Sequence, residues 1–220
     1  MTAGLEWEQF RYAWSDPRDD AAQMWRVEDV LEYTLSKTVV AEPGEQYKYS
    51  NGVSTLLGAI IRNATGMEAD AFAERYVFGP LGITDFEWTR YPDGSIETDG
   101  GLALRPRDLA KIGQLFLDGG GWDGERIVSR DWVTESTRTH VNFRGSGGGY
   151  GYKWQQMDLK VRGETVDYYF MPGYGGNLLA VIPRFDLVVV YTGANYDWDV
   201  RTVYNNLLED FLIPALRSSK

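Results

Sequence analysis

The spacing of apolar residues changes at the glycine-rich stretch 145–149, and this change constrains the fold more than any other feature. Before it, apolar residues recur at helical intervals, and glycine or proline separates the segments. After it, aromatic and aliphatic residues alternate or form short runs, as they do in strands. The pattern predicts a helix-rich region at residues 1–146 and a region of strands at residues 147–220.

Local signals place the individual elements. Helices are predicted at residues 26–37, 50–64, 69–78, 106–117 and around 130–137, where capping residues, an early proline or following glycines mark the ends. Apolar runs at 178–182 and 187–192 flank a turn and predict a β-hairpin. Short connections favour antiparallel strands, and the amphipathic stretch 200–216 predicts a closing helix packed on the sheet. The fold class is therefore α+β.

Composition excludes several classes of function. The net charge of −10, from 32 acidic and 22 basic residues, argues against a nucleic-acid partner. The sequence contains no run of about 20 apolar residues that could form a transmembrane segment, and its first residues show no signal-peptide pattern. With no cysteine and one histidine, it offers neither a thiolate nor a histidine cluster. We predict no metal and no cofactor; the cellular compartment stays open.

Several polar residues have plainer explanations than catalysis. Ser54 lacks the second glycine of a Gly-x-Ser-x-Gly nucleophile elbow. His140 has no serine motif to serve, so we expect a loop or surface histidine and not a triad base. Asp93, Glu97 and Asp99 miss the spacing of a calcium loop. We expect these three carboxylates in a solvated turn.

The strongest local signal is the segment 43–51, in which a Pro-Gly turn leads to Tyr49, Ser50 and Asn51 at a predicted helix start. A packed tyrosine followed by a capped helix would explain the triplet without any chemistry. A Tyr-x-Asn triplet alone is weak evidence, because it arises by chance in many chains. Its meaning depends on the motifs that accompany it and on their order.

Accompanying motifs run along nearly the whole chain. Tyr49-Ser50-Asn51 resembles the second active-site motif of the superfamily of serine β-lactamases, DD-peptidases and related esterases. Other segments resemble this superfamily in the same order: residues 1–5, 78–83, 100–102, 107–110, 151–154 and 173–177. Chance composition would rarely produce such a series. The chain is identified as a C-terminal portion of a member of this superfamily.

The resemblance implies a β-lactamase/transpeptidase-like fold and an acyl-enzyme mechanism. Tyr49 would act as general base or acid and relay protons to the leaving group. Asn51 would orient a lysine and the substrate amide or ester through its side-chain donor and acceptor. The strand near the third motif usually gives a backbone N–H to the oxyanion hole. The matching positions are Gly173, Tyr174, Gly175 and Gly176.

The third motif departs from the family pattern. Members often have Lys-Thr-Gly or His-x-Gly there, whereas Gly173-Tyr174-Gly175 has no cation to pair with a substrate carboxylate. Recognition of penicillin-like carboxylates is therefore not expected. A neutral, tyrosine-lined site fits aryl or short-chain esters, or small amides, as in the esterase branch of the family.

The first motif, Ser-x-x-Lys, is absent; the nearest match, residues 34–37, begins with Thr34. By resemblance the nucleophile would precede Met1 in a longer parent. The resemblance also implies export to the periplasm or secretion, as for other members of the family. This chain alone is then expected to lose about six orders of magnitude in turnover. It would also lack strands of the central sheet, leaving an open edge for self-association. The alternative is a non-catalytic binding protein that keeps the family's cleft.

Overall fold

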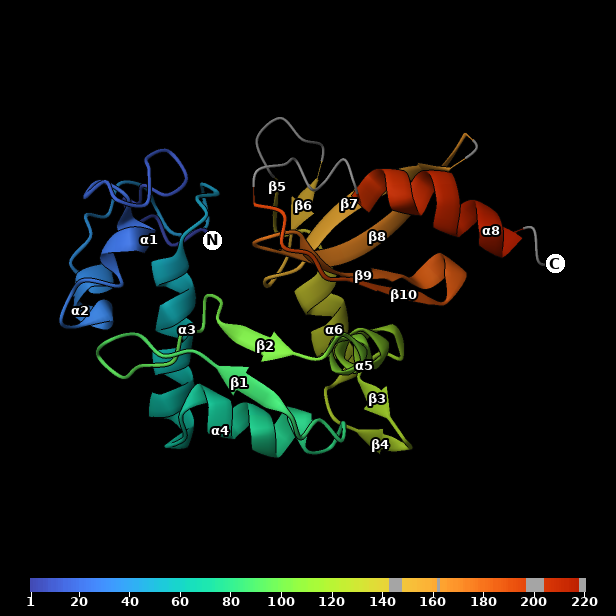
Figure 1. The fold of residues 1–220 in the computed structure, drawn as a ribbon, viewed down its shortest axis with the longest axis horizontal. Helices are drawn as coiled ribbons and strands as arrows, with labels where there is room; N and C mark the ends of the chain where they lie inside the picture. Colours follow the sequence, from blue (N-terminus) through green and yellow to red (C-terminus); the bar gives the residue numbers. More distant parts are fainter. Residues whose placement is uncertain (143–147, 162, 197–203, 218–220) are drawn as a thin grey trace. The chain divides into compact units, whose positions relative to one another are not determined.

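The computed structural model describes residues 1–142, 148–161, 163–196 and 204–217. The chain forms two compact units, residues 1–104 and 105–220 (Figure 1). Helix α5 (Pro106–Leu117) belongs with the second unit because it packs on two strands there, β9 and β10. The domain boundary predicted after residue 146 remains a prediction. The change in the spacing of apolar residues on which it rests lies within the second unit.

The first unit contains helices and one short antiparallel pair of strands. Ser50 caps its longest helix as predicted, and Gly66 ends that helix in the left-handed conformation. The predicted helix 69–78 is α-helical in its first half and π-helical in its second. The elements are α1 (Asp20–Gln23), α2 (Val30–Leu35), α3 (Asn51–Thr65), α4 (Ala69–Ala73), the π-helical segment Glu74–Phe78, β1 (Phe86–Trp88) and β2 (Leu102–Leu104).

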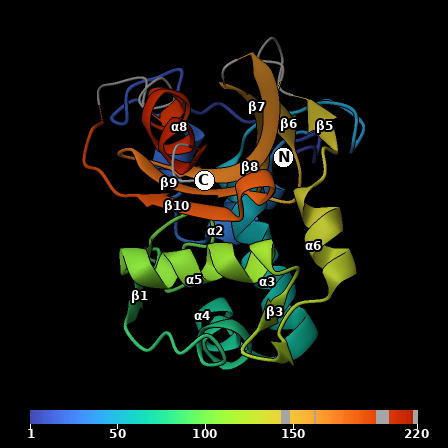
Figure 2. The same ribbon diagram turned by 90° about the vertical axis from the view of Figure 1, so that its right-hand side faces the viewer.

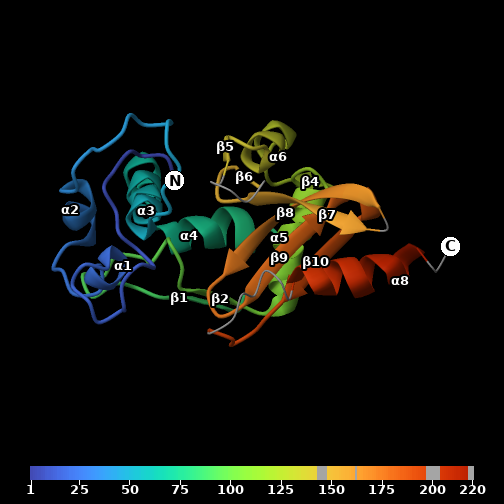
Figure 3. The same cartoon turned by 90° about the horizontal axis from the view of Figure 1, so that it is seen from above.

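The indole of Trp7 lies at the centre of the first unit. It is 0% exposed and shares a cluster with Met24, Val30 and Tyr91. Helix α2 lies beside α3 (Figure 3). Gly52, in the first turn of α3, admits the indole, because a Cβ there would lie 2.6 Å from Trp7 Cη2. The start of α3 is therefore fixed by the core of this unit.

The second unit is built on a six-stranded antiparallel sheet of order β10-β9-β8-β7-β6-β5. Its helices α5 and α6 (Arg130–Thr137) have the predicted bounds. The remaining elements are β3 (Gly121–Trp122), β4 (Glu125–Arg126), β5 (Val141–Asn142), β6 (Gly149–Tyr150), β7 (Gln155–Val161), β8 (Glu164–Gly173), β9 (Asn177–Ile182), the 3-10 turn Pro183–Phe185, β10 (Leu187–Tyr191), the π-helical segment Leu207–Leu212 and α8 (Ile213–Arg217).

Both faces of the sheet are covered by helices (Figure 2). On one face, Tyr204, Leu208 and Ile213 pack on the alternate residues of β8 and on β9. On the other face, Leu109, Ile112 and Phe116 of α5 pack around Trp154 and Leu179. Burial on both faces explains the uninterrupted apolar run of β9. The α+β class is confirmed, and within the described residues so are the hairpin and the closing helix.

Strand β10 forms one edge of the described sheet. Its sequence, LVVVY, pairs with β9 in register from Leu187↔Ile182 to Tyr191↔Leu178. An apolar edge strand is a ready template for pairing with another strand. The self-association expected from the sequence stays a prediction, and β10 is where it would occur. Within the parts of the chain that the structure covers, no helix is both long and apolar enough to cross a bilayer.

Candidate active site

The predicted catalytic pair lies where α3 begins. Ser50 is the N-cap: its backbone is extended, and its Oγ accepts the Val53 N–H at 3.2 Å. Tyr49 therefore precedes the helix and Asn51 is its first residue. Ser50 is 2% exposed, so the middle residue of the motif serves the fold. The side chains of Tyr49 and Asn51 take no part in this cap.

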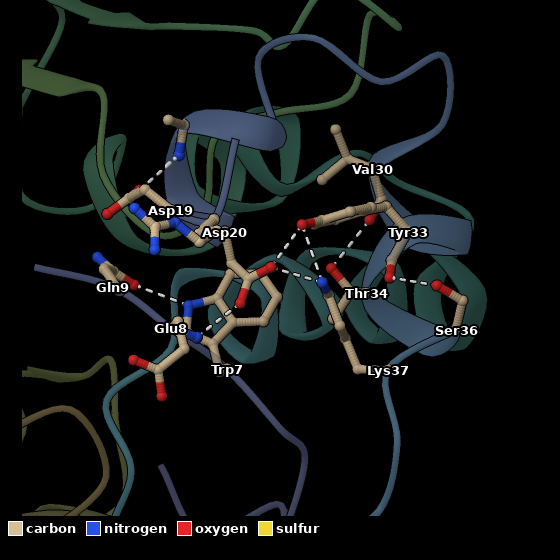
Figure 4. A network of polar contacts seen from close by, with 12 residues as sticks. Trp7, Glu8, Gln9, Asp19, Asp20, Val30, Tyr33, Thr34, Ser36 and Lys37 are labelled. Carbon is tan, nitrogen blue, oxygen red and sulfur yellow. Dashed lines mark hydrogen bonds and ion pairs between the residues drawn. The ribbon is translucent and has the colours of Figure 1, made fainter. Parts of the chain in front are cut away.

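The Asn51 side chain is held by Gln9. Gln9 Nε2 donates to Asn51 Oδ1 at 2.9 Å, and Gln9 Oε1 accepts the Asn51 backbone N–H at 3.2 Å. Gln9 is in turn fixed by the Trp7 indole, which donates to its Oε1 at 3.0 Å (Figure 4). The carboxamide of Asn51 thus has a defined orientation.

Burial raises the pKa of the Tyr49 hydroxyl, and the negative charge of Asp99 raises it further. The tyrosine ring packs on Phe10, with 5.6 Å between ring centroids. Lys48, its neighbour in sequence, is engaged by Glu8 at 2.9 Å. Tyr49 is therefore a neutral phenol at neutral pH and can donate a proton. To accept one as a base, it would need a cation close enough to favour the phenolate.

The expectation of a solvated turn was wrong for Glu97 and Asp99, although Asp93 is exposed. Asp99 is half-buried, and its Oδ1 accepts hydrogen bonds from the Tyr91 hydroxyl at 2.6 Å and the Thr55 hydroxyl at 3.0 Å. Burial, and then the charge of Asp99, raise the pKa of Glu97 to about 7. The turn therefore brings negative charge into the surroundings of Tyr49.

Replacing Asp99 by asparagine is expected to lower the pKa of Tyr49. Asparagine can still accept from Tyr91 and Thr55, but it removes the charge that disfavours the phenolate. The measurement is a pH titration of the Tyr49 ¹³Cζ resonance in protein labelled at tyrosine. Asp93→Asn, the same change in the same turn, is the control and should leave the Tyr49 titration in place. Equal titrations for D99N and the unmodified chain would contradict the expectation.

The third-motif positions lie in the second unit, at the turn between β8 and β9. Gly173 ends β8 and pairs with Asn177, while Gly175 and Gly176 have φ values of 76° and 89°. Asn177 braces the turn, because its Nδ2 donates to the Tyr174 carbonyl at 2.9 Å and its Oδ1 accepts the Gly193 N–H at 3.3 Å. The glycines are required by this geometry.

Tyr174 is 82% exposed, and its ring lies 5.0 Å from that of Tyr196. A Cβ at Gly175 would lie 2.7 Å from the Tyr196 ring, so the missing side chain makes room for the aromatic pair. Residues 163–183 contain no lysine, arginine or histidine. The turn therefore offers aromatic surface and backbone groups, and no cation.

Tyr49 and Asn51 lie together in one unit, and Gly173–Gly176 lie in the other.

The segment nearest to Ser-x-x-Lys is committed to the core. Thr34 is 0% exposed, and its hydroxyl donates to the Val30 carbonyl at 2.9 Å. Lys37 Nζ contacts Asp20 Oδ1 at 2.5 Å and the Tyr33 hydroxyl at 2.9 Å (Figure 4). Thr34 is therefore not placed as a nucleophile, and Lys37 stabilises the fold.

His140 lies in the second unit, where its Nε2 is 2.9 Å from the Glu135 carbonyl oxygen and its ring stacks on Tyr152 at 4.2 Å. These contacts agree with the expected loop histidine. Across the ranges that the structure covers, no three histidine, aspartate or glutamate side chains gather as a metal site would require.

Sequence reasoning missed Gln9 and Asp99. Asp99 directly precedes Gly100-Gly101, one of the family-like segments, and that position was the available signal. Gln9 follows the family-like segment 1–5, but no helical or strand spacing links it to Asn51. Its contact with Asn51 depends on the tertiary fold.

Curated proteins that resemble the chain in sequence include two hydrolases. The 6-aminohexanoate-dimer hydrolase of Paenarthrobacter ureafaciens is 27% identical over 166 residues, which cover 71% of this chain and 41% of that protein. The lovastatin esterase of Penicillium rubens is 27% identical over 154 residues, which cover 69% of this chain and 32% of that protein. The chain spans less than half the length of these relatives.

Solved structures share the fold. A structure named as a 6-aminohexanoate-dimer hydrolase from Bacillus anthracis aligns with a TM-score of 0.79 at 20% identity, over 96% of this chain and 58% of that one. Simvastatin synthase from Aspergillus terreus aligns with a TM-score of 0.64 at 14% identity, over 98% and 66%. The family model described as Beta-lactamase matches residues 1–208. Because this match covers nearly the whole chain, the protein belongs to the Beta-lactamase family.

Proposed function

We propose that this chain is the C-terminal portion of a serine hydrolase that cleaves small esters or amides through an acyl-enzyme. The observation that carries the proposal is the start of α3, where Ser50 caps the helix and leaves Tyr49 and Asn51 for chemistry. Tyr49 donates a proton to the leaving group, and Asn51 orients the carbonyl group. The Gly173–Gly176 turn supplies a backbone donor to the oxyanion.

The substrate class follows from the third motif. A substrate carboxylate would need a cation, and the residues from 163 to 183 provide none. The exposed rings of Tyr174 and Tyr196 suit an apolar or aromatic group. The names of two curated relatives, a hydrolase of 6-aminohexanoate dimer and an esterase of lovastatin, support an ester or amide as the bond cleaved.

The serine nucleophile and its lysine would come from outside this sequence. No Ser-x-x-Lys occurs in the 220 residues, and the hydroxyl of Thr34 is buried. The lysine would also supply the cation that Tyr49 needs to act as a base. In the protein with its full coding sequence, Tyr49 would thus serve as base and acid in turn.

Labelling with a fluorophosphonate probe tests the proposal. Two samples are compared: this chain, and the protein expressed with all coding sequence that flanks it. We expect no labelled serine in this chain and one labelled serine, within Ser-x-x-Lys, in the second sample. The second sample should also hydrolyse p-nitrophenyl acetate. Absence of both labelling and hydrolysis in that sample would refute the proposal.

The missing Ser-x-x-Lys also supports a second function, a binding protein that keeps the family's cleft without catalysis. The same experiment separates the two. If the flanking coding sequence contains no Ser-x-x-Lys, and a small ester binds without turnover in calorimetry, the binding function is favoured. A covalently labelled serine excludes it.

A further inference from the structure

The amide groups of Gln9 and Asn51 could in principle each be turned over, exchanging oxygen and nitrogen. The surrounding donors remove that freedom. Gln9 Oε1 receives hydrogen bonds from the Trp7 indole at 3.0 Å and from the Asn51 backbone N–H at 3.2 Å. Both groups can only donate. The oxygen of Gln9 must therefore face them, and its nitrogen must face the Asn51 side chain.

The orientation of Asn51 follows. Because Gln9 Nε2 is a donor, the Asn51 atom 2.9 Å from it is the oxygen Oδ1. The Nδ2 group of Asn51 then points away from Gln9, and no residue in the described ranges accepts a hydrogen bond from it. Asn51 is also not fully buried, so this donor is accessible. The indole thus sets the hydrogen-bond polarity of the Asn51 side chain through Gln9.

We propose that Gln9 is a positioning residue that makes Asn51 present a hydrogen-bond donor to the substrate. The inference rests on the proposed function and deepens it, because a fixed donor at Asn51 selects a carbonyl oxygen or another acceptor on the substrate. A substrate that offers only an N–H at this point is rejected, since two donors would meet.

The scaffold that holds Gln9 is closely packed. Trp7 is fully buried, and it reaches the start of α3 only because Gly52 has no side chain. The Asn51 N–H that Gln9 accepts is one of the N-terminal amides of α3 without a partner inside the helix. The oxygen of the Gln9 amide group therefore accepts this unpaired backbone N–H, while its nitrogen orients the Asn51 side chain.

Gln9→Glu tests the proposal, because it reverses the hydrogen-bond polarity between residue 9 and the Asn51 side chain. A carboxylate still accepts from Trp7 and from the Asn51 backbone, but it cannot donate to Oδ1. Asn51 should turn over, donate Nδ2 to Glu at position 9 and present its oxygen to the substrate. In this chain, the Asn51 Nδ2 protons are then expected to exchange with water about tenfold more slowly by NMR, because they gain a hydrogen bond.

The control is Gln46→Glu, which adds the same charge at an exposed position of the segment that leads to Tyr49. It should leave the exchange of the Asn51 Nδ2 protons unchanged. Wild-type exchange rates in a folded Q9E chain would overturn the proposal. If Q9E does not fold, Gln9→Met tests the same contact, since the Asn51 backbone N–H should then exchange about tenfold faster.

Hydrolysis by the protein with its full coding sequence gives the second measurement. Q9E should lower kcat/KM for p-nitrophenyl acetate about a hundredfold, and Q9M about tenfold, because methionine leaves Asn51 free to turn its donor to the substrate. A purely structural role predicts the opposite order, since glutamate matches glutamine in shape and still accepts from Trp7. The opposite order would overturn the proposal. A wild-type protein without hydrolysis would instead refute the proposed function, while the exchange experiment still decides the orientation of Asn51.

Discussion

Replacing Lys37 by methionine is expected to lower the free energy of unfolding of the first unit by about 3 kcal/mol. Lys37 and Asp20 form an ion pair in which the side chains are only 20% and 12% exposed. Without the ammonium group, the Asp20 carboxylate keeps two neutral donors, the Tyr33 hydroxyl and the Glu8 N–H. Removing one partner of a buried ion pair costs about 3–5 kcal/mol, because the other charge stays buried. The two remaining donors keep the expected loss of stability near the lower value.

The loss should appear in hydrogen exchange of the amides of α1, α2 and α3, measured by mass spectrometry in increasing urea. Lys48→Met is the matched control, because the Lys48–Glu8 pair has a similar nature but is 50% and 35% exposed. It should change the free energy of unfolding by less than about 1 kcal/mol. Adding Asp20→Asn to K37M should restore part of the loss. Equal losses for K37M and K48M would contradict this account.

The contribution of Lys37 to the stability of the first unit should also depend on pH. Burial opposes its charge, but the hydrogen bonds to Asp20 and Tyr33 outweigh burial and raise the pKa of Lys37 above its ordinary 10.5. A raised lysine pKa means that the stabilisation is full at neutral pH and is lost as the pH rises through the folded-state value. The difference between the wild-type chain and K37M is therefore expected to persist at pH 7 and to shrink only under strongly alkaline conditions.

Tyr49→Phe in the protein with its full coding sequence is expected to lower kcat by about 10²–10⁴-fold. The substitution keeps the ring that packs on Phe10 and removes only the hydroxyl that transfers the proton. KM should change little, because the hydroxyl acts on the leaving group and the nucleophile. Steady-state hydrolysis of p-nitrophenyl acetate measures both constants.

Tyr76→Phe is the control for this prediction. Tyr76 is 46% exposed on the π-helical segment and packs on Phe72, so loss of its hydroxyl should leave kcat within about twofold. Circular dichroism should show that both variants keep the fold. A Y49F protein with wild-type kcat would remove Tyr49 from the proposed mechanism.

Elements with strong local signals could be predicted from the sequence. Helix α5 begins with Pro106 in its first turn, α6 begins after the Ser129 cap, and both have the predicted bounds. Strands β1 and β2 were not predicted. Each has three residues, and they are held by pairing between Phe86–Trp88 and Leu102–Leu104. A strand that short is determined by its partner and not by its own composition.

The candidate site also contains residues that the sequence identifies and residues that only the structure shows. Tyr49 and Asn51 could be found because they lie two residues apart at a helix start and resemble a family motif. Gln9 lies 42 residues from Asn51, and their contact depends on the packing of Trp7 against α3. Asp99 was misjudged because its spacing in sequence gave no information about the buried hydroxyl of Tyr91. Local pattern identifies the groups that could react, and tertiary packing decides their orientation and charge.

The close fit of Trp7 against Gly52 has an evolutionary consequence. A single methyl group at position 52 would lie 2.6 Å from the indole and 2.8 Å from Thr34 Cγ2, so position 52 cannot gain a side chain while these neighbours stay in place. Among descendants of this chain, positions 7 and 52 are expected to change together: a larger residue at 52 should occur only with a smaller one at 7. Such a lineage would lose the indole donor with the ring, and its Asn51 would need a new neighbour to hold its orientation.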